Sequence, residues 1–190
     1  MGALRSFFVG TAVPIFVFWE AFMRKKTRFL AHGAIIAALY VALTYLQNIL
    51  IPDSASFAIQ FRASEALCAL ALFTPAAIPG LAIGCLLFNI SFAGALPLDF
   101  LVGSLATLLA TAGMYGLRNV KIKGYPLLAM LLPAISNALL VGWELWVYIG
   151  GGFWINALCV AIGEVAVLLT LGTALYYVLT GRGLAQRIFN

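Results

Sequence analysis

Charged side chains are scarce in this chain of 190 residues, of which Asp, Glu, Lys and Arg make up only 9%. Soluble domains carry about 25% of these residues, so the low content excludes an ordinary water-facing surface. The chain instead has 64% hydrophobic residues and a mean hydropathy of +1.08. Its apolar runs reach the length of about 20 residues that a membrane helix needs, without the short alternating segments of a membrane β-barrel. The sequence therefore predicts an all-α membrane protein.

The chain also has few of the residues that carry catalysis or hold metals. Its three cysteines, Cys68, Cys85 and Cys159, lie apart in apolar segments and predict neither a disulfide framework nor a metal site. The one histidine, His32, is expected at the cytoplasmic start of the first helix of the bundle, far from the carboxylates, which argues against a Ser-His triad or a histidine-bound metal. A GxxxxGK[ST] phosphate loop is missing. We therefore expect no enzyme, no metal and no cofactor.

Proline, glycine and polar residues divide the apolar runs into six expected transmembrane helices. The second is short because a residue that precedes proline, here Thr74 before Pro75, is pushed out of the α region. The expected helices are 30–51, 62–74, 77–91, 98–117, 126–149 and 154–180. Together they form a six-helix unit over residues 23–190.

Basic residues indicate how this unit is oriented, because short cytoplasmic loops retain Lys and Arg. Segments 24–28, 118–123 and 182–187 hold 9 of the 11 basic residues. Six crossings place all three segments on one side of the membrane. Both termini of the unit are therefore expected in the cytoplasm, and the net charge of +5 needs no nucleic-acid partner.

Residues 1–22 form an apolar segment ahead of the unit. Its apolar run is short for a span, and no small-residue cleavage site of a signal peptide follows it. Met23 with the basic residues after it has the form of a translation start. We expect residues 1–22 to be an N-terminal extension that arises from an upstream start, and the alternative is an additional half-span or interfacial helix.

Polar residues inside the expected helices are few, and charges in such helices are costly enough to mark functional sites. A rise of about 1.5 Å per residue places them all in the outer half of the bundle. Together with nearby aromatic residues, they predict a pocket that opens to the outside. Its expected lining residues are Arg62, Glu65, Asn89, Asn137, Trp143, Glu144 and Glu164.

Some of these residues have simpler explanations. Arg62 and Glu65 are three residues apart and can form an ion pair on a helix surface. Asp99 follows Pro97 and Leu98 and is expected to cap the helix that begins there. Trp143 and its aromatic neighbours can form an interfacial belt. The two deeper glutamates are the strongest candidates for a ligand site, because an unpaired carboxylate in the membrane is expensive.

Four segments of the unit carry a family resemblance. They are RFLA leading into AIIAALYVALT, then FRASEALCALALF, TPAAIPGLAIGCLLFNI and DFLVGSLATLLAT. With these segments the chain resembles the QueT family of substrate-binding S components of energy-coupling factor (ECF) transporters. The resemblance implies a subunit in a prokaryotic cell membrane that binds a queuosine precursor, a 7-deazaguanine of the preQ type, from outside. It also implies delivery through a transmembrane coupling protein that two ABC ATPases drive.

The first expected helix carries small residues at a spacing of four: Ala34, Ala38 and Ala42, with Ala37 alongside. Such a stripe lets another helix approach closely in lipid. The resemblance implies that the stripe contacts the coupling protein, since S components generally use an AxxxA stripe in their first helix for this purpose.

The chemistry of a deazaguanine suits the candidate residues. Its ring N–H and exocyclic amine favour a carboxylate, from Glu144 or Glu164, and its carbonyl favours a donor such as Asn137 or Asn89. The other carboxylate can pair with an aminomethyl ammonium, and Trp143 can stack on the ring. An S component for another vitamin-like molecule and a stand-alone facilitator remain alternatives.

Overall fold

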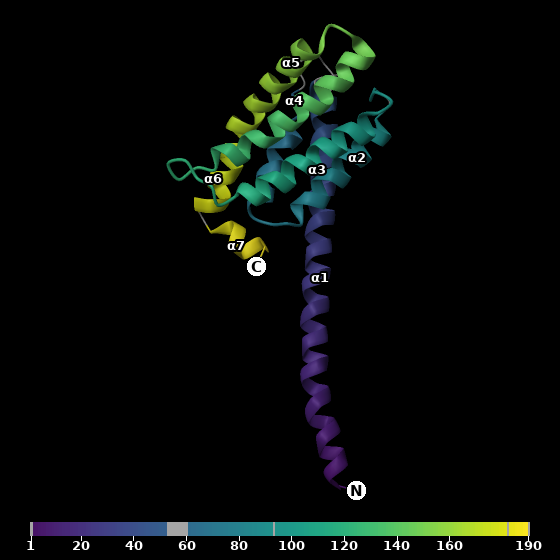
Figure 1. Ribbon diagram of the computed structural model, residues 1–190, viewed down its shortest axis with the longest axis vertical. Helices are drawn as coiled ribbons and strands as arrows, with labels where there is room; N and C mark the ends of the chain where they lie inside the picture. Colours follow the sequence, from purple (N-terminus) through teal and green to yellow (C-terminus); the bar gives the residue numbers. More distant parts are fainter. Residues whose placement is uncertain (1, 53–60, 93, 182, 190) are drawn as a thin grey trace.

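A computed structural model of the chain describes residues 2–52, 61–92, 94–181 and 183–189, and side chains from residue 23 onward. In these ranges the regular structure is helical, apart from one isolated antiparallel bridge between Ile122 and Tyr125. The all-α class is therefore confirmed (Figure 1). The elements are α1 (Gly2–Leu50), η1 (Ala63–Leu72), α2 (Ala77–Ser91), α3 (Asp99–Leu117), α4 (Leu127–Ile149), α5 (Phe153–Val167), η2 (Leu168–Gly172), α6 (Thr173–Gly181) and α7 (Leu184–Phe189).

Each of the six expected helices has a counterpart, with three corrections. The first helix begins at Gly2 instead of residue 30, so α1 runs without a break through the predicted extension and projects from the bundle (Figure 1). The second, η1, is a 3₁₀ helix, and the sixth contains a π-helical segment, η2. The helices were predicted from the length of their apolar runs, and a run that is apolar on nearly all sides has no period from which the number of residues per turn could be inferred. The sequence therefore did not show either variation.

Four helical stretches in the described part of the chain are long and apolar enough to cross a membrane. They are Met23–Leu50, Asp99–Leu117, Leu127–Ile149 and Phe153–Gly181, whereas Ala63–Leu72 and Ala77–Ser91 are shorter. These lengths support a multi-pass membrane protein. The count of six spans stays a prediction.

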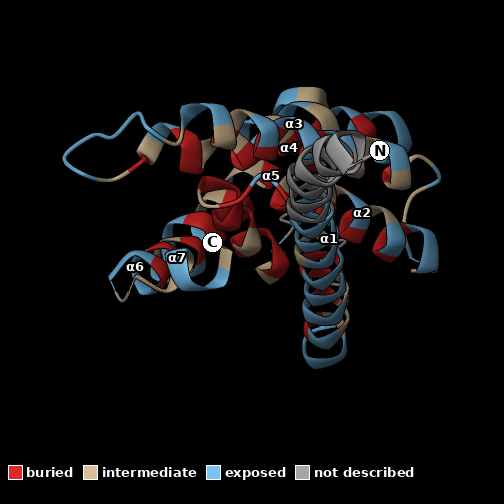
Figure 2. Ribbon diagram, turned by 90° about the horizontal axis from the view of Figure 1, so that it is seen from below, coloured by how far each residue is buried: buried red, intermediate tan, exposed pale blue. Residues whose placement is uncertain are grey.

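The outer surface of the bundle is apolar, as contact with lipid requires. On α3 the large side chains of Leu101, Leu105 and Leu109 are exposed, whereas Asp99 and Thr107 are buried. Figure 2 shows the same division on other helices, with buried positions on the faces that are directed inward. Large exposed apolar areas are rare on soluble monomers and mark contact with a membrane or another protein.

The 3₁₀ helix η1 lies at the centre of the bundle. Eight of its ten residues are buried, and it contacts α1, α2, α3, α4, α5, α6 and η2. A rise of about 2.0 Å per residue carries its backbone about 20 Å, farther than an α-helix of the same length would reach. Its small residues, mostly Ala, Ser and Cys, permit the close approach of so many neighbours.

Helices α1 and α2 pack closely because α2 presents glycine to α1. A Cβ atom on Gly80 would lie 2.7 Å from the carbonyl oxygen of Gly33, and one on Gly84 would lie 2.8 Å from the Cβ of Tyr40 and 3.0 Å from the carbonyl oxygen of Ala37. The Gly33, Ala37 and Tyr40 face of α1 is therefore occupied within the bundle.

Packing brings segments next to the three basic clusters toward one end of the bundle. The ring of His32, close to the first cluster, meets that of Phe189 edge-on at 5.5 Å, close to Arg187. The ring of Tyr125, just after the second cluster, stacks on Tyr177 of α6 at 6.0 Å. This grouping agrees with the charge pattern. The cytoplasmic location of that end stays a prediction.

Candidate functional site

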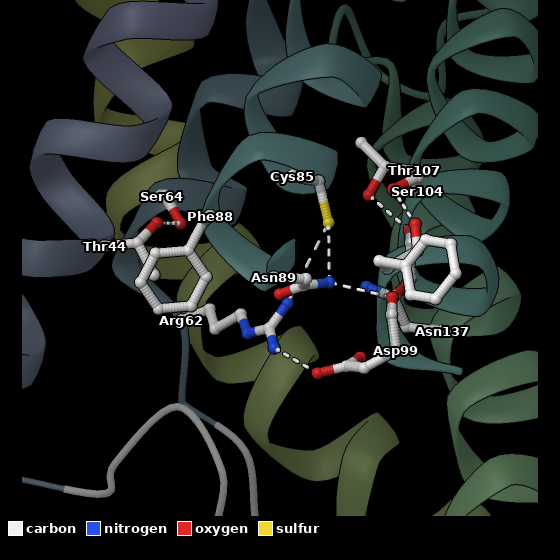
Figure 3. A network of polar contacts seen from close by, with 12 residues as sticks. Thr44, Arg62, Ser64, Cys85, Phe88, Asn89, Asp99, Ser104, Thr107 and Asn137 are labelled. Atoms are coloured by element: carbon white, nitrogen blue, oxygen red, sulfur yellow. Dashed lines mark hydrogen bonds and ion pairs between the residues drawn. The ribbon is translucent and has the colours of Figure 1, made fainter. Parts of the chain in front are cut away.

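Arg62 lies at the N-terminal end of η1, where Gln47 binds the backbone on both sides of it. The side-chain amide of Gln47 on α1 donates to the carbonyl oxygen of Phe61, and its oxygen accepts from the N–H of Ala63 at 2.6 Å. Arg62 itself is the extended N-cap residue of η1, with φ −106° and ψ 103°. Its guanidinium reaches α3, where Nη2 lies 3.5 Å from Oδ2 of Asp99 (Figure 3). Both side chains are buried.

The Arg62–Asp99 ion pair corrects two expectations. The arginine pairs with a carboxylate on another helix, and not with Glu65 three residues away. Leu98 occupies the N-cap position of α3, and no side chain caps that end, so Asp99 is the first helical residue and not the cap. Asp99 was not predicted as a site residue. The sequence did contain a signal for it: Asp99 is a carboxylate at the start of an apolar helix, and Arg62 is a basic residue in another apolar segment of the same chain.

Glu65 lies inside the bundle with donors on both oxygens. The hydroxyl of Tyr40 donates to Oε1 at 2.5 Å, and the thiol of Cys68 lies 3.2 Å from Oε2. One turn away along α1, the hydroxyl of Thr44 donates to Ser64 at 2.7 Å. These bonds join η1 to α1, so Glu65 has a clear structural role.

Glu164 on α5 and Asn137 on α4 form a buried pair. The Nδ2 atom of Asn137 donates to Oε1 of Glu164 at 2.8 Å. Oε2 of Glu164 is buried and has no hydrogen-bond partner among the described residues. The π-helical segment η2 begins four residues later, at Leu168. Such segments often occur beside functional sites.

Glu144 is the most isolated of the buried carboxylates. It lies on α4 with 0% of its surface exposed, and neither oxygen has a hydrogen-bond partner in the described part of the chain. Together with Asp99 it lines a cavity of about 230 Å³. Asn137 and Glu144 are seven positions apart, so they share a face of α4 at a separation of two turns, about 10 Å along the axis.

Asn89 completes the polar cluster from α2. Its Nδ2 atom donates to the backbone carbonyl of Asp99 at 2.8 Å and lies 3.6 Å from the sulfur of Cys85 (Figure 3). Its Oδ1 atom is buried without a hydrogen-bond partner among the described residues. Asn89 therefore links α2 to α3 and keeps one acceptor free.

The structure does not bring Trp143 together with this cluster. Its side chain is 43% exposed, and Trp146, Tyr148 and Trp154 are also exposed. Successive residues on an α-helix point about 100° apart, so the inward position of Glu144 turns Trp143 away from it. This placement favours the alternative of an interfacial aromatic belt.

The unpartnered polar atoms of the site are mostly acceptors. Among the described residues, the buried side-chain atoms without a hydrogen-bond partner are Asn89 Oδ1, both Glu144 oxygens, Glu164 Oε2 and the N–H donor Arg62 Nε. Most buried polar groups in proteins are hydrogen-bonded, so these five atoms define a candidate binding site. Its chemistry suits a small ligand with several donors and one acceptor.

Comparison with known proteins agrees with the resemblance seen in the sequence. The family model described as QueT transporter matches residues 30–181. No curated protein and no solved structure gives a significant match. The matched range contains every residue of the predicted pocket and the alanine stripe of α1. Because the match covers most of the sequence and the fold is that of an apolar helical bundle, this chain belongs to the QueT family of membrane transporters.

Proposed function

We propose that the chain is the substrate-capture subunit of an ECF-type importer and binds a 7-deazaguanine precursor of queuosine. Membership of the QueT family supports uptake of this class of compound. The observation that carries the proposal is a set of buried acceptors on Asn89, Glu144 and Glu164 that have no hydrogen-bond partner in the described part of the chain. A guanine-like ring offers donors at its ring N–H, exocyclic amine and pyrrole N–H, and therefore matches an acceptor-rich site.

Glu164 is the proposed anchor for the pyrimidine edge of the ligand. Its Oε2 atom accepts no hydrogen bond from the residues that the structure describes, and its carboxylate can accept from the adjacent ring N–H and exocyclic amine of the ligand. Asn137 holds the carboxylate in place through Oε1. The ligand carbonyl needs a donor in return, and Arg62 Nε is a buried N–H that lacks a hydrogen-bond partner among the described residues.

The cavity dimensions fit a small heterocycle. Its volume of about 230 Å³ lies below the range of roughly 300–1,000 Å³ typical of drug-sized ligands. Apolar residues, among them Val141 and Leu145, form much of its wall beside the carboxylates of Asp99 and Glu144. A flat ring in this cavity can therefore contact apolar side chains while its edge groups bond to Glu144 or Asp99.

Direct binding tests this function. The purified protein is expected to bind 7-deazaguanines in titration calorimetry and to carry one of them when ligands released from it are identified by mass spectrometry. Guanine, which shares the pyrimidine edge, should compete, whereas adenine, which lacks the donor pair beside a carbonyl, should not. A different vitamin-like molecule in the released ligand, with no response to deazaguanines, would contradict the proposal and favour the alternative S component.

The proposed coupling surface is the exposed face of α1. Ala34, Ala38 and Ala42 are exposed, whereas Ala37 on the next face packs against α2. A stripe of small residues permits close helix contact in lipid. This face is therefore available to the coupling protein, and the ATPases would act through it, since the chain has no phosphate loop of its own.

Leucine in place of Ala38 is expected to abolish co-purification with the coupling protein and two ATPases. The added side chain would fill the space that a partner helix needs, yet it points outward and should leave deazaguanine affinity within about threefold of the wild-type value. Ala112→Leu, at an exposed alanine of α3, is the matched control and should retain the complex. Retention of the complex by Ala38→Leu would contradict docking on this face, and isolation of a transport-competent chain without partners would favour the facilitator.

A further inference from the structure

We propose that the end of the bundle where α1 meets α7 binds the phosphate group of an anionic phospholipid. The site is a second cavity, of about 310 Å³, called here the basic cavity. Among its lining residues are Lys25, Arg28, Phe29 and His32 of α1, Pro75 ahead of α2, and Phe189 of α7. It shares no lining residue with the cavity beside Glu144, so the proposal is independent of the transported ligand.

Three side chains with N–H donors converge on the basic cavity from one face of α1. Lys25, Arg28 and His32 follow one another at intervals of three and four positions, the spacing of neighbours on a helix surface. The ammonium of Lys25 supplies a compact charge, and the guanidinium of Arg28 can bind two phosphate oxygens at once. The imidazole of His32 has at least one N–H to donate in either of its charge states. This face therefore has the donors that a phosphate group needs.

The described part of the chain offers these cations no carboxylate. All acidic side chains that the structure describes are buried, and they are Glu65, Asp99, Glu144 and Glu164. Glu65 reaches α1 at Tyr40, eight positions after His32 and about 12 Å farther along the axis. Lys25 and Arg28 are exposed, and neither side chain forms an ion pair or hydrogen bond with a described residue. Both cations are therefore available to an external anion.

The basic cavity depends on tertiary packing and not only on the charges of α1. Helix α7 lies beside the point where α1 leaves the bundle (Figure 1). There the ring of Phe189 meets that of His32 edge-on at 5.5 Å. Pro75 adds a wall from the connection between η1 and α2. Lys121 and Lys123 differ in this respect, because they are exposed in the loop between α3 and α4.

An apolar groove beside the basic cavity indicates a lipid and not a soluble phosphate. Phe29 lines both of them. The groove has a volume of about 370 Å³ and passes between α1 and α2 along Leu30, Gly33, Pro79 and Ile83. Leu30 and Ile83 are exposed, as lipid-facing side chains are. A phospholipid fits this arrangement, since its phosphate can occupy the basic cavity while an acyl chain lies in the groove.

The expected orientation of the bundle agrees with this occupant. The basic end is predicted to be cytoplasmic, and the cytoplasmic leaflet carries anionic lipids that attract basic residues close to the membrane surface. Basic pockets between membrane helices on that side bind lipid headgroups for the same reason. A zwitterionic lipid also has a phosphate, but its own ammonium group neutralises it. The cavity should therefore discriminate between the two kinds of lipid.

Native mass spectrometry of the detergent-solubilised chain, titrated with phosphatidylglycerol or phosphatidylcholine, tests the proposal. The coupling protein is left out, because Ala34 borders both the groove and the proposed coupling surface. The wild type is expected to bind one phosphatidylglycerol at least about 10-fold more tightly than phosphatidylcholine. The double variant Lys25→Gln, Arg28→Gln should weaken phosphatidylglycerol binding about 10- to 30-fold and leave phosphatidylcholine binding unchanged.

The matched control is the double variant Lys121→Gln, Lys123→Gln, which removes the same charge from an exposed loop. Its affinity for phosphatidylglycerol should stay within about threefold of the wild-type value, since separate surface charges are screened. Without lipid, both double variants should unfold at the wild-type temperature, because Lys25 and Arg28 have no described partner to lose. The single variants Lys25→Gln and Arg28→Gln, each with about a three- to fivefold loss, provide the same test with a smaller change to the fold.

Three results would overturn the proposal. Equal affinity of the wild type for the two lipids would show that no anionic headgroup is selected. Unchanged binding in the Lys25 and Arg28 variants, or an equal loss in the Lys121 and Lys123 control, would show that the lipid is held elsewhere or by general charge. Displacement of phosphatidylglycerol by an equal concentration of glycerol phosphate would show that the cavity takes a soluble phosphate and that the groove adds nothing.

Discussion

Replacement of Glu164 by glutamine is expected to weaken deazaguanine binding by at least about 100-fold. The carboxylate is proposed to accept two ligand hydrogens, and each hydrogen bond to a charged group contributes about 1.5–3 kcal/mol. Glutamine preserves the shape and keeps an oxygen for Asn137, but it replaces the second acceptor by an N–H₂ group that faces ligand donors. Titration calorimetry on the purified variant measures the loss, and Glu164→Ala should show no binding.

The folded state should survive this change. Oε2 of Glu164 has no hydrogen-bond partner among the described residues, so removal of the charge relieves a desolvation cost instead of breaking a second contact. Thermal unfolding in detergent is expected at or above the wild-type midpoint. Ile162→Ala, two residues away on the exposed side of α5, is the matched control and should bind normally. Wild-type affinity in Glu164→Gln would show that this carboxylate is not the anchor.

Replacement of Arg62 by methionine is expected to cost ~3–5 kcal/mol of stability. The change leaves Asp99 buried without its cation, and loss of one partner from a buried ion pair is strongly destabilising for this reason. It also removes a guanidinium that lies over the ring of Phe88 at 5.8 Å. Unfolding in mixed micelles with increasing fraction of denaturing detergent measures the free energy of unfolding.

A second substitution distinguishes the loss of the Arg62–Asp99 ion pair from a general loss of packing. Asp99→Asn added to Arg62→Met removes the orphaned charge and should recover more than half of the lost stability. Arg118→Met is the control, because Arg118 lies nearer the surface, beside the ring of Tyr115, and its loss should cost below about 1 kcal/mol. A loss below about 1 kcal/mol in Arg62→Met, or no recovery in the double variant, would show that the Arg62–Asp99 pair does not hold η1 to α3.

The sequence predicted which polar residues lie within the apolar helices, but it did not predict the direction of each side chain. A rise of about 1.5 Å per residue placed Asn137, Glu144 and Glu164 in the outer half of the bundle, and the structure buries all three. The same reasoning placed Trp143 beside them, whereas its side chain points outward. In a helix that is apolar on all sides, hydropathy does not distinguish the lipid face from the bundle face.

The spacing of residues in the sequence also did not predict the partners of the buried charged residues. Arg62 and Glu65 satisfy the helical rule for an ion pair, yet Arg62 adopts extended backbone ahead of a 3₁₀ helix and reaches Asp99 on α3. Glu65 bonds to Tyr40, 25 positions earlier in the chain. Both contacts depend on how α1, η1 and α3 pack against one another. The spacing of residues within one segment does not report this packing.

The sequence by itself determined the membrane class, the approximate positions of the apolar helices, the family and the few polar residues that interrupt these helices, because each follows from composition, run length or a motif in consecutive residues. The tertiary structure decided that η1 lies at the centre, that Asp99 pairs with Arg62, and that Glu144 is left without a hydrogen-bond partner among the described residues. The physical reason is that a buried charge must be compensated by whatever group the fold brings near it. Which group that is depends on contacts between helices that are distant in the chain.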